Sequence, residues 1–151
     1  SVRYMAKRRI GALIVFEKET ALKDYIETGI PINGNITSEL LINIFVPNTP
    51  LHDGAMIIQG DKIATAASYL PLSDSSKIAK NLGTRHRAAV GLSEVTDAFT
   101  VVVSEETGNI SVTYDSKLTK EISLDELDEL LKSHWSILPP LKEAGGLFAR
   151  K

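Results

Sequence analysis

Short, largely apolar runs between turn-forming segments constrain the fold of this chain more than any other feature. They occur at 10–16 (IGALIVF), 55–58 (AMII) and 98–104 (AFTVVVS). Apolar runs of four to eight residues with such boundaries are typical of strands, and unbroken apolar character indicates burial on both faces. The three runs therefore predict a central sheet that is covered by helices.

Helical and hairpin patterns separate these runs. Hairpin turns are predicted at 59–62 and 107–109, and they lead into strands at 63–70 and 110–114. Residues 29–35 are expected to form a loop. Helices are expected at 1–10, 21–28 and 37–46, from Ser75 or Ser76 to Leu82, from an N-cap at Thr84 to 96, and from a capping box at 123–126. The pattern predicts a single α/β domain with a central mixed parallel/antiparallel β-sheet flanked by helices.

Composition limits the classes of function. The chain has 151 residues, about one domain, and its net charge of −2 argues against a protein that coats nucleic acid. It contains no cysteine, which excludes disulfides and thiolate metal sites, and no run approaches the roughly 18 apolar residues of a transmembrane helix. The first residue is not methionine, so we expect an excised soluble domain in which 1–9 end a preceding helix and 135–151 form a weakly ordered tail.

The first candidate functional stretch is 49–58, with the sequence TPLHDGAMII. Asp53 stands between His52 and Gly54 at the mouth of a predicted strand, where a rigid sheet can present a side chain. Gly54 allows another backbone or a ligand to come close. The alternative is that Asp53 only caps a turn by accepting bonds from nearby N–H groups.

The second candidate is 83–87, GTRHR, at a loop-to-helix transition. Helix N-termini offer free N–H groups and a positive dipole end, and the guanidinium group matches phosphate oxygens. This segment can therefore hold a polyphosphate. The alternative is a pair of surface arginines that form salt bridges with neighbouring acids.

The third candidate is the acidic turn at 104–106, SEE, which follows a predicted strand. Glu106 would reach the same sheet edge as Asp53 if the two strands run parallel and close together. Carboxylate and imidazole groups there would suit Mg²⁺ or Mn²⁺ carrying a nucleotide phosphate. The alternative is a pair of solvated acids, and the sequence contains no Walker loop, GxGxxG or HExxH motif.

Together, Asp53-Gly54-Ala55, the segment YLPLS at 69–73 and GTRHR resemble the diadenylate cyclase domain, most closely its membrane-anchored CdaA-type branch. The resemblance extends from the first strand to about residue 123. It implies that the domain condenses two ATP molecules into cyclic di-AMP and releases two pyrophosphates. It also implies that three transmembrane helices preceded Ser1 and that the domain lies on the cytoplasmic side of the cell membrane.

The resemblance further implies residue roles. Asp53 would lie beside the ribose 3′-hydroxyl and the metal, and Arg85 and Arg87 would be catalytic residues that hold phosphates. Mn²⁺ or Mg²⁺ would be held by His52, Asp53 and Glu106. The nucleotide-binding set would comprise Gly54, Ala55, Tyr69, Leu70, Gly83, Thr84, Arg85, His86, Arg87, Ser104 and Glu106, with Tyr69 and Leu70 flanking the adenine.

The chemistry favours a pair of domains. The product has two-fold symmetry, so the simplest catalyst is a face-to-face homodimer in which each copy holds one ATP. Asp53 would either take the proton of the attacking hydroxyl or hold the ion, and both roles stay open. Two alternatives remain: a sensor that binds ATP or a cyclic dinucleotide without turning it over, and a structural or partner-binding domain. Regulatory protein partners are possible, but the sequence names none.

Overall fold

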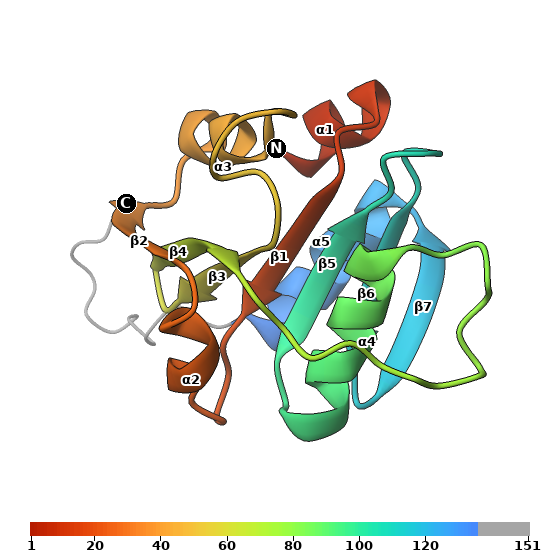
Figure 1. Cartoon of the computed structure of the whole chain (residues 1–151). Coiled ribbons are helices and arrows are strands. Elements are labelled where there is room, and N and C mark those ends of the chain that lie inside the picture. Colours follow the sequence, from red (N-terminus) through yellow and green to blue (C-terminus); the bar gives the residue numbers. More distant parts are fainter. Residues whose placement is uncertain (136–151) are drawn as a thin grey trace.

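The computed structural model describes residues 1–135 and contains a seven-stranded mixed sheet with helices on both faces (Figure 1), which confirms the predicted fold class. The strands lie in the order β2-β4-β3-β1-β5-β6-β7. They span Ala12–Phe16 (β1), Ile30–Asn35 (β2), Ala55–Gln59 (β3), Lys62–Ser68 (β4), Phe99–Val103 (β5), Ile110–Tyr114 (β6) and Lys117–Ile122 (β7). The helices span Val2–Arg8 (α1), Lys23–Ile26 (α2), Ser38–Phe45 (α3), Thr84–Val95 (α4) and Leu124–His134 (α5).

The central strand β1 is buried on both faces, as its unbroken apolar sequence predicts. Leu13 and Val15 belong to a cluster with residues of α4, whereas Ile14 and Phe16 pack with residues of α1, α3 and α5. In Figure 1, α4 lies in front of the sheet and α5 lies behind it. None of the helices formed by residues 1–135 is both long and apolar enough to cross a membrane.

The strand register brings two of the candidate stretches to one edge of the sheet. β1 pairs with β3 in parallel (Ile14 opposite Met56) and with β5 antiparallel (Ala12 opposite Val103). When both ladders are extended to Gly11, Asp53 lies on one side of this residue and Ser104 on the other. The backbones of Asp53 and Ser104 are then about 10 Å apart. The strands β3 and β5 are therefore antiparallel to each other, not parallel. Their ends still meet, because β3 begins where β5 finishes.

Several predicted elements differ from the structure. Residues 30–35 form the edge strand β2 and not a loop, and an edge position tolerates Pro31 because only one side of the strand needs partners. The helix predicted to end at Leu82 is absent, since Ser75 Oγ accepts from the N–H of Lys77 and stabilises a turn. The N-cap of α4 is Gly83, and Thr84 is its first residue.

The edge strand β7 was not predicted, because half of its sequence KLTKEI is charged and most of it is exposed. Charged residues are common on edge strands, where they discourage pairing with other chains. The predicted capping box is confirmed: Ser123 Oγ accepts from the Glu126 N–H at 3.0 Å, and the Glu126 carboxylate accepts in return. Trp135 is not loosely placed, because its ring packs on Phe16 and its Nε1 donates to the Gly60 carbonyl at 3.1 Å. The rest of the predicted tail, 136–151, lies outside the described residues.

Candidate functional site

The candidate stretches meet where β1 and β3 begin, β5 ends and α4 starts, at the upper edge of the sheet in Figure 1. Two hollows open there. The Asp53 cavity, about 230 Å³, is lined by Leu13, Asp53, Gly54, Ser68, Tyr69, Leu70, Leu72, Thr84, Arg85 and Ala88. The His86 cavity, about 260 Å³, is lined by the start of α4, the turn after β5 and residues of β6 and β7. Thr84 and Arg85 line both cavities, so the two cavities are neighbours at the start of α4.

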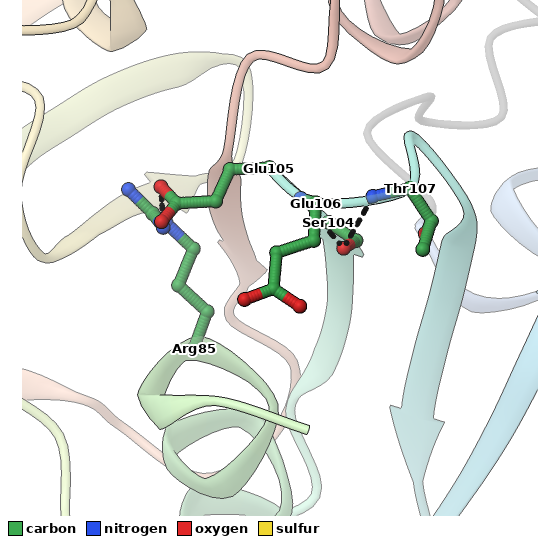
Figure 2. A network of polar contacts seen from close by, with 5 residues as sticks. All are labelled: Arg85, Ser104, Glu105, Glu106 and Thr107. Carbon is green, nitrogen blue, oxygen red and sulfur yellow. Dashed lines mark hydrogen bonds and ion pairs between the residues drawn. The ribbon is translucent and has the colours of Figure 1, made fainter. Parts of the chain in front are cut away.

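Arg85 lies between the two cavities. Its side chain is 19% exposed, and Nη1 pairs with the Glu105 carboxylate at 3.0 Å (Figure 2), while Nε is buried without a partner among residues 1–135. A Cβ atom on Gly11 would lie 2.6 Å from Nη1, so a larger residue here would displace the guanidinium from its place over the start of β1. Sequence patterns give no signal for Gly11, because the requirement comes from a residue 74 positions away.

Arg87 points elsewhere. Two residues along an α-helix correspond to a rotation of about 200°, so Arg85 and Arg87 leave opposite sides of α4. The Nη1 of Arg87 donates to the Ser73 carbonyl at 3.4 Å, and Arg87 lines neither cavity. In the described structure this arginine holds the segment that enters α4, whereas Arg85 faces the cavities.

His86 is the buried member of the motif, with 6% of its surface exposed. Burial, and secondarily the positive charge of Arg85, lower its pKa. The ring is therefore neutral at pH 7 and lines the His86 cavity. A neutral imidazole can accept one hydrogen bond and donate another.

The acidic turn after β5 makes one contact that the sequence does not assign. Ser104 Oγ accepts from the N–H groups of Glu106 and Thr107, so Ser104 stabilises the turn. Figure 2 shows the Glu106 side chain directed toward the start of α4, apart from the arginine. The acid that contacts Arg85 is Glu105, a member of the 104–106 candidate for which the resemblance implies no role. The roles of two consecutive acids in a turn cannot be distinguished without the backbone direction.

The 52–54 segment presents its polar groups outward. Asp53 is exposed at the mouth of the Asp53 cavity. His52 Nδ1 lies 2.8 Å from the Thr49 carbonyl, which can only accept, so Nδ1 donates in this contact. Gly54 has φ 111°, and a Cβ there would lie 2.9 Å from Ala67. The predicted need for glycine at 54 is thus confirmed.

Within residues 1–135, no group of three or more His, Asp or Glu side chains could hold a metal ion. The predicted ligands His52, Asp53 and Glu106 therefore do not form a complete metal site. Such a donor set suits a hard cation only if phosphate oxygens of a nucleotide complete the coordination, as is common for Mg²⁺.

The segment 69–73 forms one wall of the Asp53 cavity. Tyr69 is 73% exposed, and its N–H donates to Thr28 Oγ1 at 2.8 Å, while Leu70 lies half-buried in the cavity lining. A Cβ on Gly91 would overlap the Pro71 carbonyl. This explains a glycine inside α4: it lets the 69–73 segment lie against the helix.

Comparisons with known proteins agree with this arrangement. A curated diadenylate cyclase of Listeria monocytogenes is 65% identical over 131 residues, which are 87% of this chain and 48% of that protein. The cyclic di-AMP synthase CdaA of Bacillus subtilis is 59% identical over 135 residues, 89% of this chain and 50% of that protein. The chain thus spans about half the length of the curated relatives it matches.

Two solved structures share the fold. A double mutant of DacA from Staphylococcus aureus superposes with a TM-score of 0.88 at 75% identity, covering 89% of each chain. A hypothetical membrane spanning protein from Bacillus cereus gives a TM-score of 0.78 at 44% identity, covering 81% of this chain and 60% of that one. Residues 1–118 match the family described as DisA bacterial checkpoint controller nucleotide-binding, the DAC family. The chain belongs to this family.

Proposed function

We propose that this domain is a diadenylate cyclase, which condenses two ATP molecules into cyclic di-AMP and releases two pyrophosphates. The observation that carries the proposal is that Asp53, Thr84 and Arg85 line one cavity at the sheet edge. An acid, free helical N–H groups and a guanidinium are the groups that a phosphoryl transfer from a nucleotide needs. The printed names of the relatives from Listeria and Bacillus support the same activity.

The two cavities suggest how ATP lies. The flat adenine fits the Asp53 cavity, whose walls include the apolar side chains of Leu13, Leu70 and Ala88. The phosphates then extend along the start of α4, past Thr84 and Arg85, toward the His86 cavity. The N-cap residue, Gly83, has no side chain that could accept hydrogen bonds from the first N–H groups of α4. These N–H groups are therefore free to bind phosphate.

Asp53 acts on the ribose 3′-hydroxyl. This oxygen attacks the α-phosphorus of the second ATP, a P–O bond forms, and the bond to pyrophosphate breaks. Asp53 orients the hydroxyl and receives its proton or holds the cation that acidifies it. His52 Nε2, Asp53 and phosphate oxygens would hold Mn²⁺ or Mg²⁺, which would neutralise phosphate charge. Arg85 leaves Glu105 to bind phosphate.

The product contains two identical linkages, whereas each chain has one Asp53. Two copies facing each other therefore make the complete catalyst, and each contributes one aspartate and one ATP. The exposed side chains of Tyr69 and Leu72 beside the Asp53 cavity offer apolar surface for the partner. In the full-length protein the domain would be anchored at the cytoplasmic side of the membrane, consistent with the membrane-spanning relative.

Asp53→Asn tests the assignment. The change removes charge and basicity but little packing, because Asp53 is exposed. We expect cyclic di-AMP formation from ATP and Mn²⁺ to fall at least about 100-fold, with the melting temperature unchanged. Product is resolved by ion-exchange chromatography and mass spectrometry, and Asp61→Asn in the β3–β4 turn is the matched control. Near-normal turnover by the Asp53 variant would contradict a catalytic role for Asp53. If the parent chain bound ATP but formed no product, the domain would be a sensor.

A further inference from the structure

The edge strand β7 contains a distortion beside the His86 cavity. Ile110 pairs with Ile122 and Val112 with Thr119, so Ser111 faces two residues, Lys120 and Glu121. This is a β-bulge, and Glu121 has φ 56°. A non-glycine residue in that region costs about 1 kcal/mol or more, and such strain clusters at functional sites.

The bulge places a lysine and an isoleucine of β7 on opposite faces of the sheet. In a regular strand, Leu118, Lys120 and Ile122 would share one face of the sheet. The extra residue instead allows Ile122 to pack in the cluster under α5, while Lys120 lines the His86 cavity on the α4 side. The extra residue thus lets β7 return Ile122 to the core and still present Lys120 to the His86 cavity.

Acids outnumber cations in the lining of the His86 cavity. Its lining within residues 1–135 includes three acids, Glu105, Glu106 and Glu121, against two cations, Arg85 and Lys120. Arg85 is paired with Glu105, whereas Lys120 makes no ion pair with any residue of 1–135. The buried His86 ring also makes no hydrogen bond with any residue of that part of the chain, although it lines the cavity.

We propose that Lys120 contacts the terminal phosphates of ATP and then the leaving pyrophosphate. The inference rests on the proposed function, because it assumes that the phosphates enter the His86 cavity from the Asp53 cavity. Lys120 offers up to three N–H donors on a flexible chain, which suits the spread charge of a leaving pyrophosphate. His86 and the free N–H groups of α4 complete the lining of this end of the cavity.

The test compares ligands with and without the terminal phosphates. Calorimetry with Mn²⁺ measures binding of α,β-methylene ATP and of AMP to the parent, Lys120→Met, Lys120→Arg and Lys117→Met. Lys117 lies on the same strand but does not line the His86 cavity. We expect Lys120→Met to weaken binding of the ATP analogue about tenfold and binding of AMP not at all. Lys120→Arg should retain most of the affinity, and Lys117→Met should match the parent.

Inorganic pyrophosphate gives an independent readout, since its inhibition of the parent should weaken in Lys120→Met but not in Lys117→Met. Equal affinity of parent and Lys120→Met for the ATP analogue would overturn the inference, and so would an equal loss for AMP. Formation of cyclic di-AMP from ATP and Mn²⁺ by the parent is followed in parallel samples, because the methylene analogue lacks the cleavable bond between the α- and β-phosphates. A parent that binds the analogue through Lys120 but forms no product would refute the cyclase proposal and leave the Lys120 contact standing.

Discussion

Arg85 and Arg87 are chemically identical members of one motif, yet the structure gives them different surroundings. Arg85 rests on Gly11 and faces both cavities, whereas Arg87 binds the carbonyl of Ser73. The sequence predicts phosphate binding for both, because a motif gives residue types but not the direction of each side chain around a helix. The difference leads to unequal predicted effects of substitution.

Arg85→Ala should weaken ATP binding by roughly 1.5–3 kcal/mol, about one to two decades in affinity, because charge-assisted bonds to phosphate are lost. Arg87→Ala should leave ATP affinity within about threefold but lower the melting temperature by about 2–4 °C, the effect of about 1 kcal/mol in a chain of this size. Calorimetry and thermal unfolding separate the two effects, with Arg3→Ala in α1 as control. Equal losses of ATP affinity in both variants would show that Arg87 also binds phosphate.

The other residues of the site also fall into two groups: those whose place the sequence predicts and those whose place only the folded structure shows. Asp53 and Gly54 could be predicted because a single short segment carries both the strand mouth and the turn. The sequence does not predict the contacts of three further residues, Gly11, Glu105 and Lys120. Each depends on a contact between segments far apart in sequence, or on a bulge that no periodicity indicates.

The elements that form the site are held by close approaches of backbone. Gly91 in α4 lies against the carbonyl of Pro71, and Gly54 lies against the bulge at Ala67. Buried strands such as β1 and β5 could be predicted from composition, because apolar runs fix their burial. The edge strands β2 and β7 could not, since proline, glycine and charged residues there read as loop.

Gly91→Ala tests the importance of this packing. Helix propensity alone would stabilise α4 by up to about 1 kcal/mol. The added methyl group would instead collide with the Pro71 carbonyl, so we expect a net loss of about 1–3 kcal/mol in the free energy of unfolding, together with weaker ATP binding. Denaturant unfolding measures the first effect and calorimetry the second. Ser133→Ala, at an exposed position of α5, should be neutral or slightly stabilising, and a stabilised Gly91 variant would contradict the packing account.

At the scale of the whole molecule, the domain is proposed to carry half of an active site. One Asp53, one Arg85 and one pair of cavities serve one ATP, while the product needs two bonds of the same kind. The fold class and the family could be predicted from the sequence. The pairing of copies is inferred from the symmetry of the proposed product, and it stays a prediction because a single chain does not display it.

The most direct test is the rate of cyclic di-AMP formation per mole of domain, measured over a dilution series with ATP and Mn²⁺. Light scattering on the same samples gives the fraction of dimer. The face-to-face arrangement predicts that specific activity rises with concentration in proportion to the dimer, with two pyrophosphates released for each cyclic di-AMP. A specific activity that stays constant down to concentrations at which only monomer is present would contradict it, as would bound ATP that is never converted.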